Sequence, residues 1–348
     1  MAASAAVRPF HLLRHLQRHR FSSSSSSTTT NETPLQRSIR SAIESRDYLQ
    51  IPNLLHSNPN PNPNPNPNPF SYLSLLPPTL AARIVGDLLH SFLALRPRSL
   101  PLPAYSSLLS LSLPKPGHNF PSSVFLPIAL AVLQATLRSG APPPRETRLS
   151  LPHSWLHLRR HRRRSVAGIL SSLRALGFRL DLNTLNYFLS SLCAAGEPAE
   201  AVAVLRGMPV AGIDPDSGSY CTVIKAADDA AALLSEMVAE KGMTPRKGTV
   251  ARVVTAMRVE GELRRAAELV KFLEGKGCAV GFEAYEAVAE GCVESGEMVL
   301  AARVVAQMAR RGFVPYLGVR QRVVEGLAAI GQGELAGAVR QRLAEIGS

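Results

Sequence analysis

A pattern of two short helices that recurs about every 35 residues is the feature that most constrains how this chain of 348 residues can fold. Copies span 182–216, 217–246, 247–281 and 282–316, and a last copy covers 317–348. The copy at 217–246 is five residues shorter than the other three internal copies. No alternation of period two appears after residue 144. Such a repeat is typical of solenoids, because one hairpin buries its apolar face only against neighbouring hairpins. We therefore expect an all-α array of stacked helical hairpins.

The second helix of most copies carries small residues near its start and a methionine or leucine further along. Small residues let two helices approach closely, and a flexible thioether fills the irregular gap beneath them. We expect these side chains to lie in the core between hairpins. They are Ala199, Ala201 and Met208, then Met237, then Ala266, Ala267 and Leu269, and then Ala301, Ala302 and Met308.

The formal net charge of +13 is unevenly distributed along the chain. Residues 1–31 carry four arginines and no acid, and residues 145–181 carry nine basic and two acidic groups. Residues 182–348 instead hold 18 basic and 20 acidic groups. The repeats themselves therefore contribute none of the excess that would favour an anionic partner.

The first 31 residues have the composition of an organelle transit peptide, with the alternative of a merely disordered basic tail. Arginines alternate with apolar residues that can form an amphipathic helix, and a run of serine and threonine follows at 22–30. Arg20-Phe21-Ser22 resembles a matrix-processing junction. The arginine density favours the mitochondrion, and the chloroplast is the alternative.

Between this segment and the clear repeats we expect three further parts. Residues 32–57 predict a short helical segment that starts at Thr33-Pro34, because proline suits the first helical position. Residues 58–69 consist of Asn-Pro pairs and predict an extended linker. Residues 70–181 predict degenerate helical repeats, with apolar helical patterns at 80–95, 105–113 and 124–138 and an Arg-rich segment. The clear repeats then form two parts, 182–316 and the C-terminal capping hairpin 317–348.

The best copy resembles the pentatricopeptide repeat family, P-class, as found in plant organelles. Residues 183–196 read NTLNYFLSSLCAAG and residues 212–216 read GIDPD, which follow the family consensus nearly residue for residue. The signature of the related tetratricopeptide repeat is absent. The resemblance is strong over 182–348, weaker over 145–181 and faint over 80–144. It implies a right-handed superhelical solenoid whose first helices line the concave face.

By the same resemblance, such arrays bind single-stranded RNA with one base per repeat. The fifth and last residues of a repeat meet the base edge, which here are Asn186 and Asp216, a pair that resembles a uracil-preferring code. The second residue, Asn183, belongs to the set that sandwiches the base. The remaining pairs depart from the family pattern: Cys221 with Arg246, Ala251 with Gly281, Glu286 with Tyr316, Leu149 with Asp181, and Ser106 with Pro144.

An arginine run at 159–164 is the strongest electrostatic candidate for RNA contact. It comprises Arg159, Arg160, Arg162, Arg163 and Arg164, with His161 between them. We expect the run at a turn between two helices, where it contacts phosphate. Alternative interpretations are a solvated basic turn or a site for an acidic protein.

Signals for catalysis, metals and membranes are weak. His153, His157 and His161 share helical spacing, but no carboxylate or cysteine completes a metal site. The four cysteines fall at positions expected to be helical, where we expect them to serve as small core residues. We interpret Gly331, Gly333 and Gly337 as a hairpin turn. The longest apolar stretch, 124–137, is too short to span a bilayer. We expect no enzyme activity, no cofactor and no membrane insertion.

The leading functional hypothesis is an organellar RNA-binding protein that acts in processing, stabilisation or translation of transcripts. The alternative is an interaction scaffold, such as a subunit of an organellar ribosome or another ribonucleoprotein, that no longer reads RNA sequence.

Overall fold

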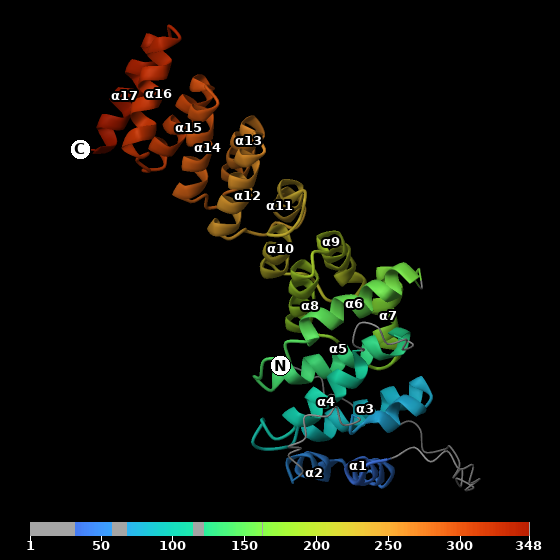
Figure 1. Cartoon of the computed structure of the whole chain (residues 1–348). Coiled ribbons are helices and arrows are strands. Elements are labelled where there is room, and N and C mark those ends of the chain that lie inside the picture. Colours follow the sequence, from blue (N-terminus) through green and yellow to red (C-terminus); the bar gives the residue numbers. More distant parts are fainter. Residues whose placement is uncertain (1–31, 58–67, 114–121, 162, 348) are drawn as a thin grey trace, which may run out of the picture.

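The computed structural model describes residues 32–57, 68–113, 122–161 and 163–347, and every regular element in these ranges is helical. The predicted all-α solenoid is confirmed. The predicted transit peptide, 1–31, and most of the Asn-Pro linker lie outside the described residues. Figure 1 shows helices that follow one another from α1 at one end to α17 at the other.

Five hairpins form the C-terminal half of the array, as the repeat predicts. Their first helices are α8 (Leu182–Ala194), α10 (Ser217–Ile224), α12 (Lys247–Val259), α14 (Phe282–Glu294) and α16 (Leu317–Ala329). Their second helices are α9 (Pro198–Gly207), α11 (Ala230–Ala239), α13 (Leu263–Gly275), α15 (Met298–Arg310) and α17 (Gly333–Gly347). Each of the ranges 182–216, 217–246, 247–281, 282–316 and 317–348 therefore contains one pair of helices.

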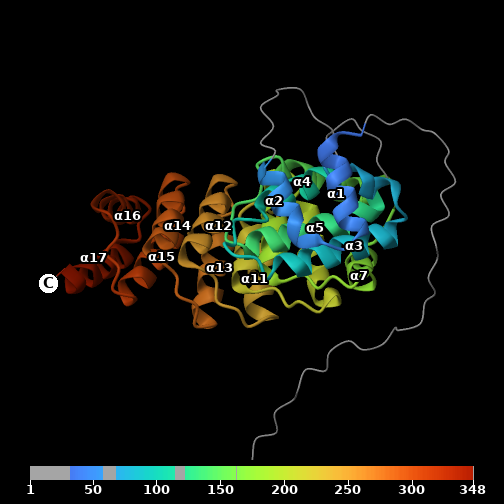
Figure 2. The same cartoon turned by 90° about the horizontal axis from the view of Figure 1, so that it is seen from below.

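First helices contact first helices along the chain, and several second helices contact one another on the other side. Figure 2 shows this as two layers, with α12, α14 and α16 in one and α13, α15 and α17 in the other. Of the predicted small residues, Ala201, Ala266 and Ala301 are fully buried between the layers. The prediction is wrong for Ala199, which is exposed in the first turn of α9, and Ala267 is only half-buried. Met208, Met237 and Met308 are also fully buried, as expected.

A glycine with positive φ follows the second helix of successive hairpins and marks the start of the connection to the next hairpin. Gly212 follows the turn after α9 with φ +69°, a conformation that costs a residue with a Cβ atom but not glycine. Glycines with positive φ recur at Gly177, Gly212, Gly242, Gly277 and Gly312. The shorter interval between Gly212 and Gly242 has a local cause. Helix α10 has 8 residues where α8 has 13, and the turn after it is longer, so the shortening falls partly there and partly in the second hairpin arm, where α11 (Ala230–Ala239) starts closer to Gly242 than α9 does to Gly212.

The N-terminal half contains seven α-helices in its described residues. They are α1 (Pro34–Glu44), α2 (Ile51–Ser57), α3 (Pro78–Phe92), α4 (Leu102–Ser112), α5 (Ser122–Arg138), α6 (Thr147–Leu156) and α7 (Val166–Ala175). Single helical turns, η1 (Tyr48–Gln50), η2 (Ser71–Leu75) and η4 (Met208–Ala211), are of the 3-10 type, and η3 (His157–His161) is π-helical. The apolar patterns predicted at 80–95, 105–113 and 124–138 correspond to α3, α4 and α5.

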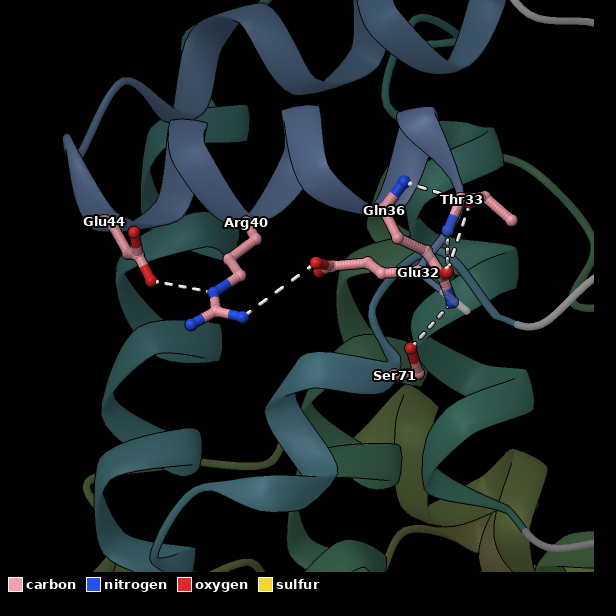
Figure 3. A network of polar contacts seen from close by, with 6 residues as sticks. All are labelled: Glu32, Thr33, Gln36, Arg40, Glu44 and Ser71. Carbon is pink, nitrogen blue, oxygen red and sulfur yellow. Dashed lines mark hydrogen bonds and ion pairs between the residues drawn. The ribbon is translucent and has the colours of Figure 1, made fainter. Parts of the chain in front are cut away.

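The predicted helix start at Thr33-Pro34 is confirmed by a capping box. Thr33 Oγ1 accepts a hydrogen bond from the backbone N–H of Gln36, and the Gln36 side chain accepts one from the Thr33 N–H. Gln36 also donates to the carbonyl of Asn68 and to Ser71 Oγ, which joins both sides of the Asn-Pro segment (Figure 3). Phe70 is fully buried. The last residues of the predicted linker are therefore docked on the array rather than extended in solvent.

Candidate nucleic-acid interface

Asn186 and Asn183 lie on α8, on the side of the helix away from its core contacts. The apolar residues Leu185, Phe188 and Leu189 are fully buried, whereas Asn186 is half-buried and Asn183 exposed. Helix α8 starts at this point because Asp181 caps it by accepting the backbone N–H of Thr184 at 2.9 Å. The buried Leu185, Phe188 and Leu189 turn one face of α8 inward, which leaves both asparagines on the open face.

The structure brings the predicted pair, Asn186 and Asp216, together through a third residue, Ser219. Asp216 is the N-cap of α10, and its Oδ1 accepts the backbone N–H of Ser219 at 2.7 Å. Ser219 Oγ lies 2.6 Å from Asn186 Oδ1 and 2.8 Å from Asp216 Oδ1. Ser219 was not predicted from the sequence, although its place three residues after a capping aspartate is a recognisable signal.

The same contacts keep the Asp216 carboxyl ionised. Burial alone would raise its pKa, but hydrogen bonds from Ser219 and from the Asn186 side chain outweigh burial and hold the pKa below its usual range. At neutral pH the cluster therefore presents a carboxylate acceptor beside an amide that can both donate and accept.

The other predicted pairs do not form a comparable polar cluster. Cys221 is buried, while its partner position, Arg246, is exposed. Ala251 and Gly281 have no side-chain group that can bond to a base. Leu149, Ser106 and Pro144 are brought together around an apolar hollow of about 650 Å³ between α4 and α6.

Glu286 and Tyr316 are in contact, but through the backbone. Glu286 is 5% exposed and its Oε1 accepts the Tyr316 N–H at 3.1 Å, while Oε2 is buried without a hydrogen-bond partner. Burial raises the pKa of this carboxyl, the Tyr316 N–H opposes that rise, and nearby Glu290 adds to it. The Tyr316 ring is 63% exposed.

Two members of the arginine run form ion pairs within the protein. Arg159 Nε donates to Glu200 Oε2 at 2.9 Å, and the indole N–H of the fully buried Trp155 donates to the same oxygen. Arg160 pairs with Glu197 at 2.7 Å. These contacts attach the π-helical turn η3 to α9, so both guanidinium groups serve the fold.

The remaining arginines of the run lie between η3 and α7. Arg163 has φ +48°, and both Arg163 and Arg164 are exposed. Neither of them has an ion-pair partner among the described residues. Arg162 lies outside those residues. The structure therefore leaves Arg163 and Arg164 as the described arginines of the run that are open to an external anion.

The first-helix layer changes charge along the array. Helices α8 and α10 carry no charged side chain, and α12 carries Lys247, Arg252 and Arg258. Helix α14 carries Glu283, Glu286, Glu290 and Glu294 at spacings of three and four residues, which place them on one face. Arg258 pairs with two of them, Glu290 at 2.6 Å and Glu294 at 2.7 Å. This acidic stripe of α14 was not recognised from the sequence.

A basic side chain that was not predicted from the sequence also lies beside α8. Arg148 of α6 is exposed and reaches Ser190 of α8 with an Nη2–Oγ distance of 3.3 Å. Since Ser190 is one turn beyond Asn186, this guanidinium lies along the same helix face as the predicted reading residues.

The described residues contain no group of three or more His, Cys, Asp or Glu side chains placed to hold a metal ion. Three cysteines, Cys193, Cys221 and Cys292, lie in helices as expected. The expectation is wrong for Cys278, which is buried in the connection after α13 because that helix already ends at Gly275. No helix in the described part of the chain is long and apolar enough to cross a membrane.

A known protein with pentatricopeptide repeats is similar in sequence to most of this chain. A pentatricopeptide repeat-containing protein from Arabidopsis thaliana is 41% identical to this chain over 320 residues, which cover 90% of each protein. The chain belongs to the pentatricopeptide repeat family. The family resemblance seen in residues 182–348 is thereby confirmed and extends over most of the chain. No family model matches this pentatricopeptide repeat chain.

Solved structures of other pentatricopeptide repeat proteins were also found. The PPR domain of Arabidopsis thaliana protein-only RNase P 1, solved in complex with tRNA, matches 48% of this chain and 91% of its own at 16% identity and a TM-score of 0.36. The maize protein PPR10 matches 90% of this chain at 14% identity and a TM-score of 0.38. That match covers 54% of PPR10.

Proposed function

We propose that this pentatricopeptide repeat protein binds single-stranded RNA and acts in post-transcriptional RNA metabolism. The observation that carries the proposal is the cluster of Asn186, Ser219 and Asp216 on the first-helix layer. Unpaired bases expose donor and acceptor edges, which amide and carboxylate groups can read. The solved structure of a pentatricopeptide repeat domain in complex with tRNA is consistent with this role.

The proposed base at this cluster is uracil, which offers both carbonyl acceptors and an N–H donor. Asn186 and Asp216 supply the complementary groups, and exposed Asn183 lies where it can pack against the base. Arg163 and Arg164 are the proposed phosphate contacts in the arginine run. Arg148 is a further candidate, because it lies beside α8.

The proposed location is an organelle, with the mitochondrion ahead of the chloroplast. The arginine-rich composition of residues 1–31 supports import, and the relative from Arabidopsis is consistent with it. Import of the radiolabelled full chain into isolated mitochondria and chloroplasts would decide between the two organelles. We propose that the protein itself has no catalytic activity and that it needs no cofactor.

A second candidate function is supported by the acidic stripe of α14. Four glutamates on a first helix oppose phosphate, and the repeats at 182–348 have no net positive charge to attract RNA. These features favour a scaffold role within an organellar ribonucleoprotein or ribosome, where one part of the array contacts RNA and another contacts protein.

Crosslinking and sequencing of RNA bound to the tagged full-length protein in isolated organelles would test the first proposal. We expect enrichment of a discrete transcript that is lost in the Asn186→Ala variant. Co-sedimentation with a large complex, together with unchanged behaviour of Asn186→Ala, would support the scaffold instead.

A further inference from the structure

Ser219 joins two neighbouring hairpins at the site of the proposed base contact. Its side chain lies on α10, is completely buried, and reaches across to Asn186 on α8, 33 residues earlier in the chain. Its Oγ accepts the backbone N–H of Asp216 at 3.2 Å. The hydroxyl is therefore held from one side and has a single proton to donate.

Of the two oxygens near that proton, Asn186 Oδ1 is the closer, at 2.6 Å against 2.8 Å for Asp216 Oδ1. Asp216 Oδ1 also already accepts the Ser219 backbone N–H. A hydroxyl that donates toward Asn186 selects the amide orientation in which the oxygen faces Ser219. The NH₂ group then lies on the side of the amide opposite to Ser219 Oγ.

Fixing this orientation matters because the two ends of an asparagine amide have nearly the same shape but opposite hydrogen-bonding roles. An amide that presents N–H to a base selects a carbonyl acceptor, such as a uracil oxygen. If the amide turned by 180°, it would present its oxygen and would favour a base amino group, as in cytosine. The Ser219 hydroxyl is thus in a position to decide between these two bases without touching either.

We propose that Ser219 is a positioning residue that fixes the Asn186 amide and thereby sets the base preference of this repeat. The inference rests on the proposed function of Asn186 as a base-reading residue. Base preference in this repeat then depends on three residues: the predicted pair Asn186 and Asp216, and Ser219 at the third position of the following hairpin.

The chain contains a matched control one hairpin earlier. Thr184 occupies the same third position of α8, and its N–H and Oγ1 bond to the capping Asp181 at 2.9 and 2.6 Å. The residue that corresponds to Asn186 there is Leu149, which is 69% exposed and has no amide to orient. Loss of the Thr184 hydroxyl therefore removes an equivalent capping contact without affecting a base-reading side chain.

The test measures binding of the full-length protein to single-stranded oligo(U) and oligo(C) RNA of equal length by fluorescence anisotropy. We expect the wild type to prefer oligo(U), so the ratio of the Kd for oligo(C) to the Kd for oligo(U) is above one. Ser219→Ala should lower this ratio by about threefold to tenfold, the effect of losing one hydrogen bond. Ser219→Thr should restore the ratio, since it keeps the hydroxyl. Thr184→Ala should leave the ratio unchanged while lowering Tm about as much as Ser219→Ala.

Two outcomes separate failure of this inference from failure of the proposed function. If Asn186→Ala lowers the ratio and Ser219→Ala does not, the base-reading role stands and the positioning role is overturned. If the wild type binds neither RNA, the proposed function is overturned. In that case the side-chain amide resonance of Asn186, assigned with Asn186→Ala, still tests the contact. It should shift in Ser219→Ala and not in Thr184→Ala, and an unchanged resonance in both would overturn the positioning role.

Discussion

Arg159 and Glu200 form an ion pair of 2.9 Å that ties the start of the arginine run to helix α9. The same Glu200 oxygen accepts the indole N–H of Trp155, which is fully buried and packs edge-on against Phe188. A segment that resembles a free basic patch in the sequence is therefore, at Arg159, bonded to the same carboxylate as a buried tryptophan.

Replacing Glu200 with alanine should destabilise the protein by about 2 kcal/mol, because it leaves a buried indole N–H and a partly buried guanidinium without their acceptor. The measurement is urea unfolding followed by circular dichroism. Glu197→Ala is the control, since it breaks the exposed pair with Arg160 and should change stability by less than about 0.5 kcal/mol. Equal losses in the two variants would contradict a structural role for the Trp155–Glu200–Arg159 contact.

The two open arginines should account for the salt dependence that the run contributes to RNA binding. Each phosphate contact on a single strand adds roughly 0.7 to the slope of log K against log salt concentration, so Arg163→Ser with Arg164→Ser should reduce the slope by about 1.4. Binding would be measured to oligo(U) at several salt concentrations. Arg160→Ser should leave the slope unchanged, because that side chain is already paired with Glu197. A slope that responds only to Arg160 would reverse this assignment.

Glu286 should weaken the fold at neutral pH. Burial raises its pKa above the unfolded value, so ionisation costs folding energy above the folded pKa, and the cost disappears as pH falls through that pKa. Glu286→Gln keeps an acceptor for the Tyr316 N–H and removes the charge. We expect it to raise the unfolding free energy at pH 7 and to raise it less at pH 4.5.

Glu290→Gln provides the comparison for that experiment on the same helix face. It removes a charge that is paired with Arg258 rather than unpartnered, so it should not stabilise the protein. The measurement for both variants is urea unfolding at the two pH values. Stabilisation of similar size in both would mean that relief of general repulsion in the acidic stripe, and not burial of Glu286, is responsible.

Gly291 permits a close approach between α14 and the preceding hairpin. A Cβ atom there would lie 2.5 Å from Leu263 Cδ2 and 2.9 Å from Arg258 Cγ. Gly291→Ala should therefore destabilise the protein by about 1–3 kcal/mol. Gly337→Ala in α17, where a Cβ atom would meet nothing within 4 Å, should instead stabilise it by about 1 kcal/mol. Thermal unfolding of both variants tests the contrast, and stabilisation by both would show that the Gly291 contact relaxes freely.

Much of the fold could be predicted because its determinants are local. The buried alanines and methionines of the second helices repeat with the hairpins, and glycines such as Gly212 and Gly277 end successive hairpins with positive φ. The start of α1 at Pro34 could be read from two adjacent residues. Asn183, Asn186 and Asp216 were predicted as reading residues from the family resemblance alone; helical spacing accounts only for Asn183 and Asn186 sharing one face of α8.

The partners of individual side chains could not be predicted in this way. Arg159 finds Glu200 in the layer formed by the next hairpin, and Gln36 bonds to Asn68 and Ser71 across the Asn-Pro segment. Ser219 meets Asn186 through the register between α8 and α10. Periodicity states which face of a helix is buried but not which atoms of the next hairpin lie opposite.

The repeat, the order of the hairpins and the faces they bury can thus be read from the amino-acid sequence, because each depends on residues a few positions apart. Which charges are free and how the Asn186 amide is oriented can be read only from the packed array. Those properties depend on contacts between hairpins, and the packing of one layer on the next sets them at distances of a few ångströms.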